Sequence, residues 1–231
     1  MRILLLTPVF GRPEITKIWA KNVWIKDVLA VLSPEDKHIE ANKKIIFDFE
    51  RCSAVLYKNN PLGEKMNEAV KWAYHNADFD YLMNLDSDGI LHKGILDLYK
   101  PLFDAGSQFF GPDKVYFIDY KTKKIRISKP NFWCSGRVIS RKIIEKLLKM
   151  GENLYYNEDN RGLDARSVEK VERLTLERFE HVKTNDIPYI LDIKTWHSLN
   201  DFNFIQNLSE DCDQDIIRRY FPKKVIRSIY G

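Results

Sequence analysis

The stretch DFDYLMNLDSDGIL, residues 78–91, contains the features from which both the fold and the chemistry of this chain can be predicted. The mostly apolar residues 81–85 predict a buried strand, and Gly89 then allows the chain to turn away sharply. Asp86 and Asp88 lie between these two features, at the end of the strand where open α/β sheets bind their ligands.

The pair Asp86 and Asp88 suggests a site for a divalent cation. A buried carboxylate is costly unless a cation or strong hydrogen bonds satisfy it. Carboxylate oxygens beside a cleft suit Mg²⁺ or Mn²⁺ carrying a phosphate-bearing substrate. The same residues also suit a plain turn, because turns favour Asp, Ser and Gly. The surrounding sequence has to distinguish a metal site from a turn.

The composition indicates an ordinary globular protein. The chain has 231 residues, enough for one α/β domain with a sizeable core, and 44% of them are hydrophobic and 30% charged. The net charge of +4 is a mild basic bias that does not by itself indicate a nucleic-acid partner.

Compartment and membrane association can also be predicted. The three cysteines, Cys52, Cys134 and Cys212, are scattered and lack the spacing of a metal site, which predicts a reducing, cytoplasmic compartment. The apolar residues 3–6 are too few for a signal peptide, and no run approaches the ~18–20 apolar residues of a membrane span.

Strands and helices are expected to alternate in the first part of the chain. We expect strands at residues 2–6, 44–49, 53–57 and 81–85, and helices at residues 15–32 and 64–75. Later helices are expected at residues 94–103, 141–150 and 163–180, and later strands at residues 109–110, 115–120, 125–128 and 189–193. This order predicts an α/β fold with a mainly parallel sheet flanked by helices.

Several segments follow one another in a recognisable order. They are the loop TPVFGRPE at residues 7–14, the helix start with Asn60, Gly63, Lys65 and Asn67, the Asp-Ser-Asp motif, residues 133–141, and the segment NRGLD at residues 160–164. Together they resemble the GT-A family of nucleotide-sugar glycosyltransferases, in a compact form akin to family 2. Gly11 differs from this pattern, because the family usually has Asn at its position.

The resemblance implies a GT-A domain over residues 1–205. Its nucleotide-sugar-binding half would be residues 1–92 and its acceptor and catalytic half residues 93–205, followed by a basic helical tail at residues 206–231. The implied activity is transfer of a hexose from a nucleotide sugar, with UDP-sugars favoured, to a hydroxyl group of a glycan, a protein or a hydroxylated DNA base. The implied cofactor is Mn²⁺ or Mg²⁺.

Donor-binding residues follow from the same resemblance. The nucleotide would contact Thr7, Pro8, Phe10, Arg12, Asp48, Lys65, Asn67 and Asp86. Asp48 or Glu50 would accept the imide hydrogen of uracil, and Lys65 would place a charge beside the diphosphate at a helix amino end. The alternatives are core packing for Phe10, a surface acid for Asp48 and a solvated lysine for Lys65.

The resemblance also suggests which residues hold the metal. Asp88 would be the main ligand, and Asp86 would reach the ribose or a metal-bound water. His197 would be a third ligand, since a neutral imidazole suits Mn²⁺. A lone histidine is, however, often just a half-exposed polar residue.

An inverting enzyme needs a general base for the acceptor hydroxyl. Asp164 is our first choice, with Glu158 and Asp159 as competitors in the same loop. An acid at a helix start is also stabilised by the helix dipole alone. In a retaining enzyme Asp164 would instead position the sugar.

Two other functions remain open. Residues 86–91 superficially resemble the signature of HAD-type phosphatases, with Asp86 as nucleophile, but Ile90 replaces a threonine and the motif follows the fourth expected strand rather than the first. A catalytically inactive GT-A domain could bind nucleic acid through the basic residues 216–231. Those residues also suit an amphipathic helix docked by Ile216, Ile217, Val225 and Ile226.

Overall fold

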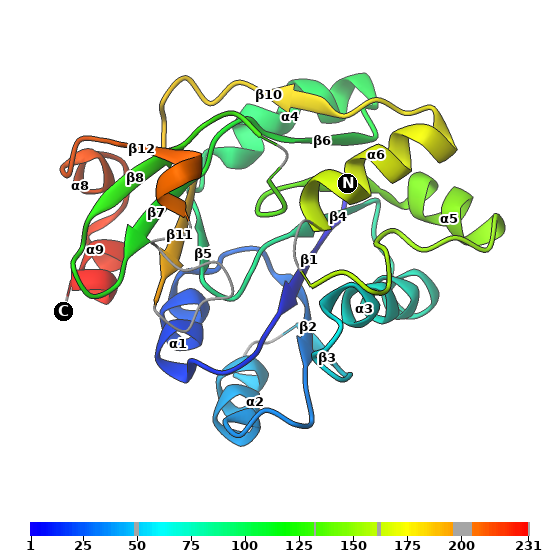
Figure 1. The fold of residues 1–231 in the computed structure, drawn as a ribbon, viewed down its shortest axis with the longest axis horizontal. Helices are drawn as coiled ribbons and strands as arrows, with labels where there is room; N and C mark the ends of the chain where they lie inside the picture. The colour runs from blue at the N-terminus through cyan, green and yellow to red at the C-terminus, as the bar shows by residue number, and fades with distance from the viewer. Residues whose placement is uncertain (49–50, 132, 161–162, 196–204, 231) are drawn as a thin grey trace.

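Two β-sheets organise the chain in the computed structural model, which describes residues 1–48, 51–131, 133–160, 163–195 and 205–230 (Figure 1). The strands of the larger sheet, in their spatial order, are β10 (Glu180–Val182), β6 (Phe109–Pro112), β9 (Val138–Ser140), β4 (Tyr81–Asn84), β1 (Ile3–Pro8), β2 (Asp27–Leu32) and β3 (Cys52–Leu56). Strands β3, β2, β1 and β4 run parallel, and β9 is antiparallel to both of its neighbours. The predicted mainly parallel sheet is therefore confirmed.

The smaller sheet continues from the end of β4. Its strands, in spatial order, are β12 (Ser209–Asp211), β8 (Ile125–Ser128), β7 (Tyr116–Asp119), β11 (Ile190–Lys194) and β5 (Gly89–Leu91). Strand β11 runs parallel to β7 and antiparallel to β5. As a result β11, from late in the chain, lies directly beside the strand that follows Asp88.

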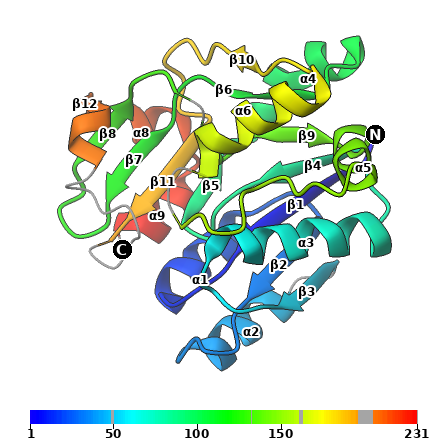
Figure 2. The same cartoon turned by 45° about the vertical axis from the view of Figure 1, so that its right-hand side comes forward.

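Helices cover both faces of the larger sheet, because successive side chains of its strands point to opposite sides. Leu4 and Leu6 pack towards α3 (Leu62–Asn76), α5 (Arg141–Lys149) and α6 (Leu163–Thr175). Leu5 packs towards α1 (Pro13–Asn22), α2 (Ile39–Phe47) and α4 (Ile95–Ala105). Figure 2 shows α3, α5 and α6 on the same side of this sheet.

Three expected elements differ from the structure. The helix predicted over residues 15–32 ends at Asn22, and residues 27–32 form β2, whose side chains from Val28 to Leu32 are all buried, as in a central parallel strand. The strand predicted over residues 44–49 is instead the end of α2, which buries Asn42 and Ile46 one helical turn apart. The helix predicted over residues 163–180 ends earlier, and its last residue begins β10.

The carboxyl-terminal segment packs on the smaller sheet. It contains the 3₁₀ helix η1 (Gln206–Leu208), β12, α8 (Ile216–Tyr220) and α9 (Lys223–Tyr230). Ile217 and Val225 are buried against this sheet, and Ile216 and Ile226 pack beside them, so the docked amphipathic segment is present, but as two short helices rather than one. No described helix is both long and apolar enough to cross a membrane.

Candidate active site

The turn with Asp86 and Asp88 connects the two sheets, because β4 belongs to the larger sheet and β5 to the smaller one. The Gly89 amide donates to the Asp86 carbonyl oxygen at 2.8 Å and closes the turn. A Cβ atom on Gly89 would lie only 2.6 Å from the Leu85 side chain, so the packing favours glycine here. Asp86 is half-buried and Asp88 is buried.

Two cationic side chains meet Asp88. Arg12 Nη1 donates to Asp88 Oδ2 at 2.9 Å, and Lys194 Nζ lies 3.9 Å from the same oxygen. Lys194 also forms an ion pair with Asp192, at 2.6 Å. The antiparallel register of β11 on β5 places Asp192 opposite Gly89, which brings this third carboxylate to the motif.

Asp192 and Lys194 are not among the site residues predicted from the sequence. A signal was nevertheless present, because the end of the predicted strand at residues 189–193 and the residue after it read Asp-Ile-Lys. Two opposite charges on the same face of an apolar strand have to be paired if that face is buried. The sequence does not indicate that Asp88 lies next to this pair, since that depends on the register of β11 with β5.

Burial and charge shift the pKa values of all three carboxyl groups. Burial, together with the negative charge of Asp88, raises the pKa of Asp86 to about 6 and that of Asp192 to about 8. For Asp88 burial opposes ionisation, but the charges of Lys194 and Arg12 outweigh it and the pKa is lowered. The two raised values reflect crowding of negative charge in a buried site.

The residues of this cluster fit a divalent cation. Asp88 Oδ1 and Asp192 Oδ1 are buried and have no hydrogen-bond partner within the described structure. An added cation would satisfy such oxygens and favour the ionised forms. Among the described residues no group of three or more His, Cys, Asp and Glu side chains is already gathered as a metal site. His197, the predicted third ligand, lies outside the described residues.

The loop after β1 has a fixed shape. Gly11 and Arg12 both adopt left-handed backbone conformations, with φ of +62° and 43°. Asp36 accepts a hydrogen bond from the Gly11 amide at 2.8 Å, and Asn42 donates to the Gly11 carbonyl oxygen at 3.0 Å. This anchoring sends the Arg12 side chain towards Asp88. Asp36, which the sequence analysis did not single out, therefore shapes the predicted nucleotide loop.

The predicted nucleotide contacts in this loop differ in exposure. Thr7 is fully buried near the end of β1, and Pro8 is the last residue of that strand. Phe10 is 41% exposed, so the alternative of core packing does not hold for it. Pro13 is the first residue of α1, as predicted.

Lys65 and Asn67 contact protein groups. Lys65 Nζ donates to the Val9 carbonyl oxygen, Ser33 Oγ and Asn59 Oδ1 at 3.2, 2.8 and 3.0 Å. Its side chain is fully buried, which excludes the solvated-lysine alternative, and burial lowers its pKa to about 7. Asn67 donates a hydrogen bond to the Tyr155 carbonyl oxygen and accepts one from the Tyr155 amide. Contact of Lys65 and Asn67 with a diphosphate stays a prediction.

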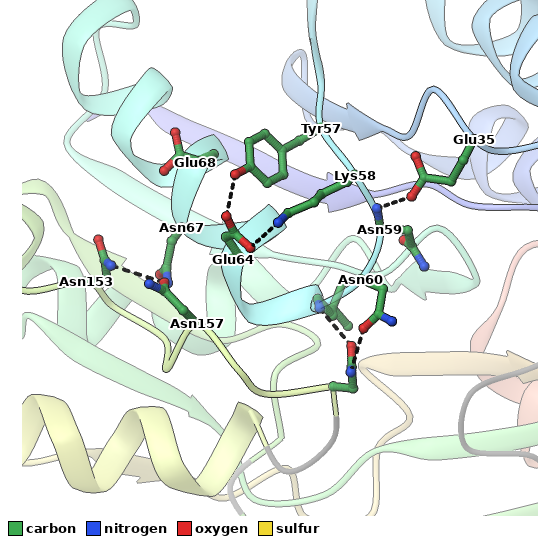
Figure 3. A network of polar contacts seen from close by, with 12 residues as sticks. Glu35, Tyr57, Lys58, Asn59, Asn60, Glu64, Asn67, Glu68, Asn153 and Asn157 are labelled. Carbon is green, nitrogen blue, oxygen red and sulfur yellow. Dashed lines mark hydrogen bonds and ion pairs between the residues drawn. The ribbon is translucent and has the colours of Figure 1, made fainter.

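The amino end of α3 is covered by the loop at residues 156–160, part of which is drawn in Figure 3. The amides of Gly63 and Glu64 donate to carbonyl oxygens of Asp159 and Asn157, at 2.7 and 3.2 Å. A Cβ atom on Gly63 would lie 2.0 Å from a carbonyl oxygen of this loop. This glycine thus serves close loop packing, which differs from the expected approach of the helix end to a diphosphate.

The prediction for Asp48 rests on a strand that does not form. Asp48 is exposed and caps the carboxyl end of α2. It therefore precedes the amino end of β3, whereas Asp86 and Asp88 follow the carboxyl end of β4. In a parallel sheet these are opposite edges, so Asp48 is in the wrong place to contact a nucleotide bound there. Glu50 lies outside the described residues.

The three candidate bases have different surroundings. Asp164 is half-buried in the first turn of α6, and its negative charge contributes to the raised pKa of Asp86. Glu158 is exposed and lies 3.6 Å from Arg166, which also forms an ion pair with buried Asp159. Burial raises the pKa of Asp164, against the influence of Arg137. The arrangement favours Asp164 among the three.

The fold, a mainly parallel sheet flanked by helices, is that of the GT-A glycosyltransferases. One solved structure with this fold is TarS from S. aureus in complex with UDP-GlcNAc, with 13% sequence identity and a TM-score of 0.55 over 84% of this chain and 59% of that one. Another is the mannosyltransferase PcManGT from Pyrobaculum calidifontis in complex with GDP-Man and Mn²⁺, with 13% identity and a TM-score of 0.57 over 84% of this chain and 56% of that one.

These similarities concern the fold. The chain spans about three-fifths of the length of those two proteins, and 37% of the longer S. aureus TarS structure. No protein-family model and no curated protein sequence matches it.

Proposed function

We propose that this protein is a metal-dependent glycosyltransferase that moves a hexose from a nucleotide sugar to a hydroxyl acceptor, with UDP-sugars as the favoured donors. The observation that carries the proposal is the buried cluster around Asp88. It combines carboxylate oxygens that lack a partner with two cations at the carboxyl edge of a GT-A sheet. The neighbouring complexes with UDP-GlcNAc and with GDP-Man and Mn²⁺ support the donor class and the metal.

Asp86 and Asp88 hold the divalent cation, which when bound supplies positive charge to the departing nucleoside diphosphate. Arg12 keeps the Asp88 carboxylate ionised and orients it through their hydrogen bond. Lys194 forms an ion pair with Asp192 and orients that carboxyl group. Phe10, exposed on the loop after β1, is free to contact the nucleobase.

Asp164 acts as the general base in an inverting transfer. It accepts the proton of the acceptor hydroxyl while that oxygen forms its bond to the anomeric carbon. The bond between this carbon and the diphosphate oxygen breaks at the same time, and the nucleoside diphosphate leaves with the electron pair.

A donor screen tests the proposal. The protein is incubated with Mn²⁺ and each common nucleotide sugar, with glycan, protein and hydroxymethylated DNA acceptors, and release of nucleoside diphosphate is measured. We expect release from at least one UDP-sugar, and its loss in Asp88→Asn. Asp97→Asn, an exposed acid in the first turn of α4, is the matched control. If no donor is turned over or bound, the chain is not a glycosyltransferase.

A further inference from the structure

Arg137 is a buried arginine that lacks a carboxylate at ion-pair distance. Its side chain is 1% exposed, and among the described residues no side-chain carboxylate oxygen lies within 4.0 Å of its guanidinium nitrogens. Burial of a guanidinium group is costly, and the group stays charged at any ordinary pH. A charge kept in such a place requires either compensation by hydrogen bonds or a functional partner nearby.

The hydrogen bonds of Arg137 hold the start of α6. Nη1 donates to the Asp164 carbonyl oxygen at 3.0 Å and to Ser167 Oγ at 2.9 Å. Nη2 lies 3.3 Å from Cys134 Sγ and 3.4 Å from Tyr155 Oη. The guanidinium group thus joins the first turn of α6 to two other segments of the chain.

One of these contacts leads back to the carboxylate motif. Asn84, the last residue of β4, donates from Nδ2 to Tyr155 Oη at 2.9 Å. The main chains of Asn84 and Arg137 are also joined, since the Asn84 amide donates to the Arg137 carbonyl oxygen at 2.9 Å. Asn84 stands two residues before Asp86. Arg137 therefore connects the strand end that carries the motif to the helix start that carries Asp164.

The backbone before Arg137 is shaped to place it there. Gly136 has a φ of +79°, and a Cβ atom on it would lie 2.2 Å from Ile190 Cδ1. Only glycine adopts this conformation and fits this space without strain. The turn at Gly136 directs the following side chain into the interior, between the rings of Phe109 and Tyr155, whose centroids lie 5.9 and 5.8 Å from the guanidinium carbon.

We propose that Arg137 is a positioning residue for catalysis, which fixes the Asp164 carboxylate relative to Asp86 and Asp88 and stabilises its ionised form. This inference rests on the proposed function. The charged or titratable groups that influence Asp164 include Arg137 and Cys134 from the turn before β9, Lys194 from β11 and Asp86 from the end of β4. The positive charge of Arg137 is the largest single influence in favour of the carboxylate, and hydrogen bonds from Cys134 add to it. Its removal therefore makes Asp164 harder to ionise.

The test compares the pH dependence of kcat in Arg137→Met with that of the unaltered protein. When Asp164 is misplaced and its pKa is raised, we expect kcat to fall about 100-fold. The acid limb of the profile should move up by about one pH unit. The donor KM is expected to change little, since Arg137 is buried and its hydrogen bonds go to protein groups. Arg137→Lys keeps the charge but not the two-pronged geometry, so it retains the acid limb and loses part of kcat.

Arg141→Met is the matched control. Arg141 is four residues further along and also donates to two main-chain carbonyl oxygens, those of Ala77 and Tyr74, at 2.7 and 2.6 Å. It lies at the start of α5 and is not connected to Asp164 by any of these bonds. Its loss lowers stability without moving the acid limb. If Arg141→Met and Arg137→Met shift the profile equally, or if neither does, the proposal is wrong.

A double-mutant cycle tests the same coupling without activity. Thermal unfolding is measured for Arg137→Met, Asp164→Asn and the double variant at pH 7, with Arg137→Gln as a substitute if the methionine variant does not fold. We expect the loss of Tm in the double variant to be smaller than the two single losses combined. Additive losses overturn the coupling whatever the activity. Absence of turnover in the unaltered protein contradicts only the proposed function.

Discussion

Arg12 Nη1 donates to Asp88 Oδ2 at 2.9 Å although 76 residues separate the two side chains in sequence. The loop after the first strand and the turn after the fourth are therefore one unit. Its members depend on each other, because Asp88 is buried and its ionised form is held by Arg12 and Lys194.

Arg12→Met should destabilise the protein by about 3 kcal/mol, since it leaves the buried Asp88 carboxylate with only the more distant Lys194. Chemical denaturation at pH 7 measures the loss. Arg51→Met is the control, because its ion pair with Asp27 is largely exposed and should contribute at most about 1 kcal/mol. Equal losses of stability in the two variants would contradict the expectation that the buried Arg12–Asp88 pair contributes more than the exposed Arg51–Asp27 pair.

Removal of divalent cations should abolish transfer. We expect turnover to vanish in excess EDTA and to return with Mn²⁺ or Mg²⁺, because the unpartnered oxygens around Asp88 are suited to a hard cation. Asp88→Asn should lose most activity even with saturating metal. Circular dichroism and unfolding curves check that this variant is folded. Undiminished turnover in EDTA would mean that the positively charged side chains beside Asp88, those of Arg12 and Lys194, support transfer without a divalent cation.

Asp164→Asn should lower kcat by about 10²- to 10⁴-fold and leave the affinity for the nucleoside diphosphate nearly unchanged, because proton transfer acts only in the transition state. Steady-state kinetics and calorimetry separate the two quantities. Glu158→Gln, in the same region but exposed and paired with Arg166, should retain activity. If donor affinity collapses while kcat persists, Asp164 is a binding residue.

Lys65 should make stability depend on pH above neutrality. Burial lowers its pKa from 10.5 to about 7, so between these values the unfolded chain binds more protons than the folded one. The unfolding free energy of the unaltered protein relative to Lys65→Met should therefore be flat below pH 7 and rise above it. The slope has an upper limit of about 1.4 kcal/mol per pH unit.

Unfolding curves between pH 6 and 9 measure this difference. Lys71→Met, on the same helix but in a partly exposed pair with Glu68, is the matched control. A flat difference for Lys65→Met across the whole range would mean that the ammonium group stays charged in the folded protein.

DNA should bind weakly to the carboxyl-terminal helices. Arg218 and Arg219 lie 3.3 Å from Asp215 and Asp213, and α8 and α9 are docked on the smaller sheet. Fluorescence anisotropy at low and moderate salt should give no steep salt dependence, and Arg218→Ala with Arg219→Ala should change little. Tight binding that falls steeply with salt and is lost in the double variant would assign this segment to a nucleic-acid acceptor.

Local sequence patterns predicted much of the framework. Residues 81–85 are mostly apolar and β4 lies within them, and the following Asp-Ser-Asp-Gly forms the expected turn. The helices predicted at residues 64–75 and 141–150 correspond to α3 and α5. These features depend on neighbours within a few residues, such as a helical period of apolar side chains or Ser140 as the N-cap of α5.

Other segments were misassigned because local preference and tertiary packing disagreed. The apolar residues of β2 suit either a helix or a buried strand, and only their place between β1 and β3 selects the strand. The isoleucines of α2 favour a strand locally, yet this segment is a helix that packs against the larger sheet through Ile46. The misassigned α2 also displaced Asp48 in the prediction, to the opposite edge of the sheet.

The sequence alone determined which residues could carry the chemistry, and the tertiary structure decided which of them act together. Asp86 and Asp88 stand out because only Ser87 separates them in the chain. Asp192 and Arg137 become relevant only through the antiparallel pairing of β11 with β5 and the turn at Gly136. Such pairings join residues far apart in the chain, and their register is fixed by the burial of whole strands, which no short sequence pattern encodes.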